Sequence, residues 1–328
     1  MVELSKIKFA IPKGSLEEAT FKILEKSWTK VNRKTRTYRV YLDDPQIMVK
    51  MVRPQEIPTL VADGLYDVGI TGNDWVEETK ANVVSILDLE YGKIKLVVAF
   101  PDIYHYKNLD SMISDYAKKK KILRISSEYL TTASKFIKQS KSYRKFYGSK
   151  NPLIVTPWVR LGTNKKVQIH LSFGATEAKP PEDVDAIMDV TESGTTLKQN
   201  KLKIADKVLE SSAHLIVNKN SLKDKSKREK IFDIVTLMRG AVRGKKYLHI
   251  YLNVEEKNLK KLLKQIPALK KPTISPLSEK GWCGVNTVIP KSDYHKLIPK
   301  LRKIAQGLVV HELRQILELE EIKRDEEK

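Results

Sequence analysis

Short apolar runs alternate with segments of helical spacing along most of this chain. Apolar residues at every third or fourth position predict amphipathic helices, and continuous apolar runs bounded by glycine, proline or hydroxyl residues predict buried strands. Strands are predicted over 7–11, 47–52, 94–100, 121–126, 167–171, 184–190 and 213–217, and in the first part of 67–74. Helices are predicted over 16–26, 54–64, 129–139 and 197–202, and directly after 67–74. This recurring order of strand, turn and helix predicts an α/β fold with parallel strands and with ligands at their carboxyl ends.

The pattern changes from Lys246 onward. Apolar alternation predicts strands over 247–253, 285–289 and 308–313, and helical spacing predicts helices over 256–266 and 294–304. These elements fit the order β-α-β-β-α-β, which is typical of a ferredoxin-like α+β domain. Residues 138–151 are basic and irregular and are predicted to form a loop or a locally inserted element. The charged tail over 318–328 is predicted to be a frayed helix.

Composition limits the class of protein. A chain of 328 residues with 41% hydrophobic residues can bury two or three cores. Cys283 is the only cysteine, which excludes an internal disulfide and a metal site built from thiolates. No stretch approaches the roughly 20 apolar residues of a membrane span, and the first residues carry no signal-peptide run. We therefore expect a cytoplasmic enzyme with no membrane partner.

The formal net charge of +21 allows several interpretations. Nucleic acid, an anionic membrane surface, anionic small substrates and a solvated lysine-rich surface are all compatible with it. Lysines at 118–121 and within 141–150 are scattered over predicted loops and helix faces, without interleaved aromatic residues that would stack on bases. We therefore favour a solvated basic surface and expect no nucleic-acid partner.

A hydroxyl-rich turn follows the apolar run at 184–190. Its residues are Ser193, Gly194, Thr195 and Thr196. Three hydroxyls and an open backbone at a strand-to-helix junction favour an anion, because unpaired N–H groups face outward there. Asp189, near the end of the strand, is placed to accept hydrogen bonds from a sugar diol or to contact a metal held by a phosphate. Glu192 would repel a phosphate and is expected to point to solvent. An ordinary capped helix start has the same composition, so the turn alone does not decide its use.

Two further turns have similar chemistry. Gly14 and Ser15 follow the strand at 7–11 and open the next helix, where Lys13 could meet a phosphate or remain a plain loop lysine. Thr71 and Gly72 repeat the design at the end of the next predicted strand. Three strand–turn–helix units therefore present anion-compatible turns, as expected of a fold that collects a phosphorylated ligand at one sheet edge.

Four motifs together resemble ATP phosphoribosyltransferase, and their order and spacing match that family over most of the chain. They read Lys13-Gly-Ser-Leu16, Arg53-Pro-Gln-Glu-Ile-Pro58, Gly64-Leu-Tyr-Asp-Val-Gly-Ile-Thr-Gly-Asn-Asp74 and Asp185-Ala-Ile-Met-Asp-Val-Thr-Glu-Ser-Gly-Thr-Thr-Leu-Lys-Gln-Asn200. The resemblance implies a two-lobed α/β catalytic region like a type II periplasmic binding protein, with the active site in the cleft. The first lobe would comprise 1–95 and 219–245 and the second 96–218. Residues 246–317 would form an ACT-like regulatory domain, followed by the tail at 318–328.

The resemblance also implies the reaction and the roles of residues. The 5-phosphoribosyl group of phosphoribosyl pyrophosphate (PRPP) would pass to N1 of the adenine of ATP in the first step of histidine biosynthesis, with Mg²⁺ carried by the pyrophosphate and no certain protein metal ligand. Catalytic groups would be Asp189, Glu177 and Lys13. PRPP would be bound by Asp189, Glu192, Ser193, Gly194, Thr195, Thr196, Lys13, Thr71 and Gly72. ATP would be bound by Gly14, Ser15, Arg53 and Asp74.

Regulation and assembly are implied in the same way. Long-form members bind histidine as an allosteric inhibitor between neighbouring C-terminal domains, and Thr273 and Ser275 lie in the loop that matches this site, with Leu308 nearby. Self-association to a dimer or hexamer is therefore expected. A catalytically silent regulatory paralogue stays open as an alternative, since it would keep the fold. A solute-binding receptor would also keep the fold, but it would need an export signal, which is not seen, and the anion-compatible turn has no use with most solutes.

Overall fold

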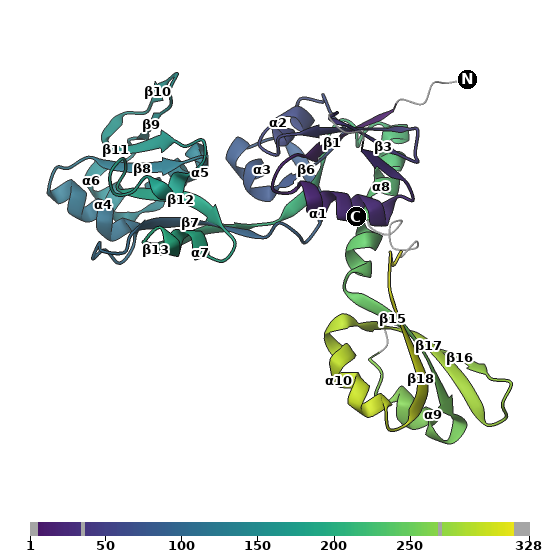
Figure 1. Ribbon diagram of the computed structural model, residues 1–328. Helices are drawn as coiled ribbons and strands as arrows, with labels where there is room; N and C mark the ends of the chain where they lie inside the picture. Colours follow the sequence, from purple (N-terminus) through teal and green to yellow (C-terminus); the bar gives the residue numbers. More distant parts are fainter. Residues whose placement is uncertain (1–5, 34–36, 268–270, 318–328) are drawn as a thin grey trace. The chain divides into compact units, whose positions relative to one another are not determined.

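The computed structural model describes residues 6–33, 37–267 and 271–317 (Figure 1). The chain divides into two compact units. Unit 1 comprises Met1–Lys8, Glu17–Lys50 and Leu222–Lys328, and unit 2 comprises Phe9–Leu16 and Met51–Ser221. Three β-sheets with flanking helices account for the architecture.

The first sheet has the strand order β2-β3-β4-β1-β5-β14-β6. Its strands are β1 (Ile7–Pro12), β2 (Val31–Arg33), β3 (Arg39–Leu42), β4 (Ile47–Val52), β5 (Val68–Gly72), β6 (Val83–Asp88) and β14 (Ala213–Asn218), and the intervening helices are α1 (Glu17–Ser27), α2 (Ile57–Ala62) and α3 (Asn73–Thr79). β1 and β5 are parallel, whereas β14 is antiparallel to both β5 and β6. The strands predicted at 7–11, 47–52 and 67–74 are confirmed, and β2, β3 and β6 were not foreseen.

The second sheet lies within unit 2 and has the order β10-β9-β11-β8-β12-β7-β13. Its strands are β7 (Ile94–Pro101), β8 (Leu123–Ser127), β9 (Pro152–Val155), β10 (Arg160–Leu161), β11 (Asn164–Leu171), β12 (Ala186–Thr191) and β13 (Leu202–Ser211), with helices α4 (Leu109–Lys118), α5 (Leu130–Gln139), α6 (Lys141–Tyr147), η1 (Thr176–Ala178) and α7 (Thr195–Gln199). β9, β11, β8 and β12 are parallel, and β7 is antiparallel to β12. Both sheets are therefore mixed, with antiparallel pairs beside the parallel ones.

Two sequence predictions in this region are wrong. The segment at 213–217 does not close the second lobe, because β14 pairs with β5 and β6, and its Leu215 lies opposite Ile70 and Leu87. The helix predicted over 197–202 ends at Gln199, since Lys201 takes a positive φ of 55° and Leu202 starts β13.

For residues 138–151 the sequence left a loop and a locally inserted element as alternatives, and the second is confirmed. The structure has helix α6, because the side chain of Ser140 accepts a hydrogen bond from the backbone N–H of Tyr143 and the Tyr143 ring is fully buried. An N-cap and one aromatic anchor are sufficient to order this basic segment.

The third sheet lies within unit 1 and follows helix α8 (Lys225–Gly244). Its elements are β15 (Tyr247–Glu255), α9 (Glu256–Leu263), β16 (Thr273–Pro276), β17 (Trp282–Pro290), α10 (Lys291–Leu301) and β18 (Ala305–Glu312). The order β16-β17-β15-β18 is antiparallel throughout, and α9 and α10 cover one face (Figure 1). Alternate residues of β15 are buried against those helices, which confirms the ferredoxin-like prediction. The predicted tail helix at 318–328 lies outside the described residues.

The segment after β18 returns to the helices that precede the third sheet. The guanidinium of Arg314 donates to the backbone carbonyls of Lys26, at 3.0 Å, and Trp28, in the last turn of α1 and just beyond it. The N–H of Ile316 donates to the carbonyl of Gly240 in α8 at 3.0 Å. A cation at a helix C-terminus satisfies carbonyls that lack partners within the helix. The end of the chain is therefore part of the packing around α1 and α8.

Candidate functional site

Asp189 lies near the carboxyl end of β12, with a partly buried side chain. The backbone N–H of Val190 donates to its Oδ1 at 2.7 Å. Burial raises the pKa of Asp189 and the charge of Glu177 adds to this, while hydrogen bonds from Val190 and Thr176 and the charge of Lys179 act in the opposite direction. A carboxylate held in this way is ready to accept hydrogen bonds from a polar ligand.

The hydroxyl-rich turn directly follows this strand. Gly194 has a φ of +81°, and its N–H donates to Oγ1 of Thr191 at 2.8 Å. The hydroxyls of Ser193 and Thr195 lie 2.9 Å apart, and both residues are exposed, as is Thr196. The turn therefore presents its hydroxyl groups to solvent within a few residues of Asp189, as the sequence indicated.

A lysine that the sequence analysis missed completes this group. The ammonium of Lys179 donates to the hydroxyls of Ser172, at 2.7 Å, and Ser126, at 3.2 Å. Ser172 and Thr176 are themselves 2.8 Å apart. Glu177 lies within the short helix η1, between Thr176 and Lys179. The sequence signal was a single cation two residues after Glu177, which is too common in loops to stand out.

Glu128 is a second residue that sequence reasoning missed. It directly follows β8 and is partly buried. Burial raises the pKa of Glu128 and the charge of Asp189 adds to this, while a hydrogen bond from Gln55 and the charge of Lys179 lower it. The site thus contains two carboxylates that affect each other. An acidic residue just beyond a predicted strand was the available signal.

The loops after β1 and β4 lie next to each other. The N–H of Lys13 donates to the carbonyl of Val52 at 2.8 Å. Gly14 has a φ of +100°, and a Cβ added there would lie 3.8 Å from Nη1 of Arg53. Ser15 is exposed and precedes the first residue of α1 by two positions. The structure therefore brings Lys13, Gly14 and Arg53 together at the carboxyl ends of the neighbouring strands β1 and β4.

Thr71 and Asp74 have partners within the protein. The buried hydroxyl of Thr71 donates to the carbonyl of Pro54 at 2.7 Å. The carboxylate of Asp74, only 5% exposed, accepts hydrogen bonds at 2.6 Å from both Tyr129 and Ser211. Gly72 lies between them, and a Cβ there would come within 2.2 Å of Oδ1 of Asp74. These contacts hold the turn at 71–74 in place.

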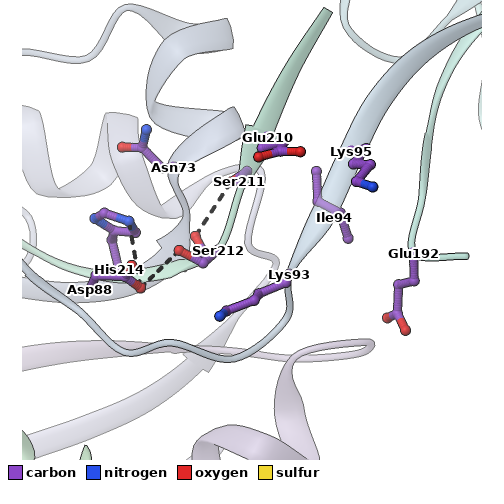
Figure 2. A pocket seen from close by; sticks show the side chains of 10 residues that line it. All are labelled: Asn73, Asp88, Lys93, Ile94, Lys95, Glu192, Glu210, Ser211, Ser212 and His214. Carbon is purple, nitrogen blue, oxygen red and sulfur yellow. Dashed lines mark hydrogen bonds and ion pairs between the residues drawn. The ribbon is translucent and has the colours of Figure 1, made fainter. Parts of the chain in front are cut away.

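A cavity of about 520 Å³ lies beside this turn, and Figure 2 shows the side chains that line it. Glu192 is on its wall, exposed, with its carboxylate directed away from the other labelled side chains, in agreement with the expectation that it points to solvent. Asp88 accepts from Ser212 at 2.8 Å and lies 3.8 Å from Nε2 of His214, whose Nδ1 is 2.7 Å from Ser85. The serine therefore meets Nδ1 and the aspartate lies beyond hydrogen-bond distance of Nε2, which is the reverse of a hydrolytic triad.

The predicted regulatory residues are placed differently from the expectation. Thr273 and Ser275 belong to strand β16 and not to a loop, because they pair with Asn286 and Gly284 of β17. Both are exposed. Leu308 is in β18, at the opposite edge of the sheet, and packs against the domain core. One chain therefore does not bring Leu308 and the β16 residues together.

The part of the chain that the structure describes contains neither a cluster of metal ligands nor a membrane-spanning helix. Within 6–33, 37–267 and 271–317, three or more His, Cys, Asp or Glu side chains do not gather in a way that would hold a metal ion. No helix in this part of the chain is long and apolar enough to cross a membrane.

Comparison with known proteins decides the family. The profile described as "HisG: ATP phosphoribosyltransferase" matches residues 53–240, and that described as "HisG, C-terminal domain" matches 244–315. An ATP phosphoribosyltransferase from Solibacter usitatus is 37% identical over 317 residues, which cover 95% of this chain and 99% of the relative. The chain belongs to the ATP phosphoribosyltransferase family. It has the long form, with the C-terminal domain.

A second relative agrees with membership of the ATP phosphoribosyltransferase family, and a solved structure agrees with the fold. The enzyme of this name from Thermodesulfovibrio yellowstonii is 33% identical, and the match covers 95% of this chain and 98% of that one. The solved ATP phosphoribosyl transferase (HisG:HisZ) complex from Thermotoga maritima contains a chain with a TM-score of 0.54 and 24% identity, covering 71% of this chain and 96% of that chain. This likeness supports the predicted α/β fold over the part of the chain that it covers, and the four-stranded third sheet has the strand order of the predicted C-terminal ferredoxin-like domain.

Proposed function

We propose that this chain transfers the 5-phosphoribosyl group of PRPP to N1 of the adenine of ATP, giving phosphoribosyl-ATP and pyrophosphate in the first step of histidine biosynthesis. The supporting observation is that the family match over 53–240 includes a strand whose Asp189 is followed directly by a turn of exposed hydroxyls. An acid for the ribose diol and a turn for the 5-phosphate are the two groups that a phosphoribosyl donor requires.

The donor would lie along the end of β12. The exposed hydroxyls of Ser193, Thr195 and Thr196 and the N–H groups of the turn would bind the 5-phosphate, and Gly194 permits this backbone because a left-handed φ suits glycine. Asp189 would accept hydrogen bonds from the ribose hydroxyls, with Glu177 beside it. Lys179 supplies the positive charge that keeps two neighbouring acids from repelling the donor.

The pyrophosphate and the nucleotide would meet the loops of the first sheet. Lys13 is the cation for the leaving pyrophosphate, with the backbone of Thr71 and Gly72 beside it, and Gly14, Ser15 and Arg53 would contact ATP. Mg²⁺ neutralises the charge of the pyrophosphate when it is bound. Such an ion would arrive with the substrate phosphates, and Asp189 is the carboxylate that would meet it.

The reaction is a displacement at C1 of the ribose. N1 of adenine supplies the electron pair of the new bond, the bond from C1 to the pyrophosphate oxygen breaks with its electrons on the oxygen, and the adenine loses one proton. Positive charge develops on the ribose and negative charge on the leaving group. Positioning and charge stabilisation therefore account for the acceleration, without a covalent nucleophile. Asp189 holds the ribose in line, and Lys13 faces the charge that develops on pyrophosphate.

The direct test is formation of phosphoribosyl-ATP, followed by absorbance, with ATP, PRPP and Mg²⁺. Turnover that depends on both substrates supports the proposal. A folded protein that binds PRPP in calorimetry but gives no product at any salt concentration or temperature would instead be a catalytically silent paralogue.

Substitution of Gly194 tests the turn. Gly194→Ala should raise the KM for PRPP by about fivefold to thirtyfold, because an alanine in the left-handed region costs about 1–2 kcal/mol. Gly194→Asn is the matched control, since asparagine tolerates this conformation, and it should raise the KM less. Steady-state kinetics on both variants checks this, and equal KM values for wild type and Gly194→Ala would show that the turn is not used.

Regulation and assembly complete the proposal. We infer that histidine inhibits the enzyme through the domain that begins near Lys246, and that the protein works in the cytoplasm as a dimer or hexamer. Thr273, Ser275 and Leu308 are our candidates for the histidine site. Their positions on opposite edges of one sheet agree with a site shared by two subunits, where β16 of one chain would meet β18 of its neighbour.

A further inference from the structure

Helix α3 contacts the start of α5 in three ways, all of them within unit 2: a hydrogen bond, a ring stack and a carboxylate that accepts from two backbone N–H groups. The hydroxyl of Tyr129 donates to Oδ2 of Asp74 at 2.6 Å, and the Trp75 ring stacks on the Tyr129 ring with centroids 4.5 Å apart. The carboxylate of Glu78 accepts from the N–H groups of Thr131 and Thr132 at 2.8 and 2.9 Å. A short helix connected to the first sheet is thus fixed to a helix that packs on the second.

Asp74 is the centre of this contact. Its second oxygen accepts from the hydroxyl of Ser211 at 2.6 Å, while its own N–H donates to the same hydroxyl at 2.9 Å. Ser211 is the last residue of β13, where the chain leaves the second sheet for β14 of the first. One buried carboxylate therefore joins α3, the N-terminus of α5 and a strand that connects the sheets.

The hydrogen bond between Tyr129 and Asp74 has a defined donor and acceptor. Burial raises the pKa of Tyr129 and the charge of Asp74 adds to this, so the hydroxyl stays protonated and donates to the carboxylate. A hydrogen bond to a buried carboxylate is stronger than one between neutral groups. Glu78 also accepts hydrogen bonds from two N–H groups at the start of α5 that have no partner within the helix.

These residues are next to groups assigned to both substrates. Gly72 and Asp74 border the same turn, and a side chain on Gly72 would collide with the Asp74 carboxylate. Tyr129 directly follows Glu128, which interacts with Asp189. Displacement of either partner would therefore move the pyrophosphate turn relative to the ribose acid.

We propose that Asp74, Tyr129 and Ser211 form an internal latch that positions the turn at 71–74 against the end of β8, and that they act as positioning residues for phosphoribosyl transfer. The role in transfer rests on the proposed function. Small displacements disturb the alignment of two substrates. Loss of the latch therefore lowers kcat more than it weakens binding of either substrate.

Tyr129→Phe is the test variant, because it removes one hydroxyl and keeps the ring on Trp75. Tyr116→Phe is the matched control: Tyr116 donates to the carboxylate of Asp185 at 2.9 Å, a bond of the same type that lies wholly within the region of the second sheet. We expect kcat of Tyr129→Phe to fall about tenfold with each KM changed less than about threefold, and kcat of Tyr116→Phe to stay at the wild-type value.

Hydrogen exchange followed by mass spectrometry gives a second readout that does not need turnover. Amides of α3 and the first turn of α5 should exchange about tenfold faster in Tyr129→Phe than in wild type or Tyr116→Phe. Unchanged exchange in these helices overturns the latch. Faster exchange with unchanged kcat overturns the positioning role.

If wild type shows no turnover, the proposed function fails while exchange still decides the latch. The same kinetic and exchange measurements on Ser211→Ala test the latch and the positioning role if Tyr129→Phe does not fold.

Discussion

Replacing Asp189 by asparagine is expected to lower kcat by about 10- to 100-fold while the protein stays folded. Asparagine has nearly the same shape but accepts weaker hydrogen bonds, and a bond to a charged group is worth about 1.5–3 kcal/mol. If the ribose becomes more positive in the transition state, the carboxylate interacts with it more strongly there than in the ground state, so the loss falls on kcat. Steady-state kinetics with both substrates measures it.

The same substitution is expected to raise the thermal midpoint at neutral pH. Burial raises the pKa of Asp189 in the folded protein, so the folded state binds more protons than the unfolded state between the ordinary value of 3.8 and the raised value. Stability contributed by this group is present below pH 3.8 and is lost as pH rises through the folded pKa. Above both values the charged carboxylate carries its full burial penalty, and asparagine removes it.

The pH dependence of the rate follows from the same shift. The ionised form of Asp189 binds the ribose, so kcat/KM should fall as pH drops through its raised pKa, and this acid limb should weaken in Asp189→Asn. The groups that face Asp189 are Glu128, Glu177 and Lys179. Because the pKa of Glu128 is raised as well, the fall of kcat/KM at low pH reflects the titration of both acids. The same pH profile measured on Glu128→Gln separates their contributions.

One control variant and one comparison variant accompany the Asp189 experiment. Asp183→Asn changes an exposed acid six residues earlier and should leave the kinetics and the thermal midpoint unchanged. Thr196→Ala removes one exposed hydroxyl of the turn and should chiefly raise the KM for PRPP. Wild-type kinetics for both substrates in Asp189→Asn would remove this residue from the site.

Histidine in excess is expected to inhibit the intact enzyme, and Thr273→Ala is expected to weaken that inhibition by about tenfold or more. A hydrogen bond lost from a charged ligand is worth about 1.5–3 kcal/mol, which corresponds to this change in affinity. The C-terminal domain contains none of the residues assigned to the substrates, so histidine would act by favouring one global state while leaving the ATP contacts intact.

The structure changes how this test must be made. Truncation before Lys246 would remove the ferredoxin-like domain together with Arg314 and Ile316, which bind backbone carbonyls of α1 and α8. A truncated chain would therefore lose packing as well as the regulatory domain. Point variants in the full chain avoid this, because Thr273 and Ser275 are exposed.

Calorimetry and rate measurements with histidine check the regulatory prediction. Ser275→Ala should also weaken binding, whereas Ser292→Ala, at an exposed position on α10, is the control and should respond as wild type. If histidine neither binds the intact protein nor changes its rate, the domain serves assembly or stability alone. Normal inhibition of Thr273→Ala and Ser275→Ala would place the histidine site elsewhere.

The sequence by itself determined the elements whose causes are local. β4 spans Ile47–Val52 as predicted, because six mainly apolar residues end at a proline-containing turn. Pro58 lies at the start of α2, where its fixed φ suits the first helical turn. The left-handed Gly194 after the apolar run of β12 was readable for the same reason, since only a few neighbouring residues decide such a turn. These features sufficed to place Asp189 beside the hydroxyl-rich turn.

The tertiary structure alone decided which distant residues meet. Asp74 bonds to Tyr129 and Ser211, which are 55 and 137 residues away in sequence, so no local pattern distinguishes it from an exposed ligand contact. β14 has the same apolar pattern whichever sheet it joins, and only its pairing with β5 and β6 settles the matter. Local patterns fix backbone conformation through near neighbours, whereas burial and charge depend on contacts between segments that the chain brings together only when it folds.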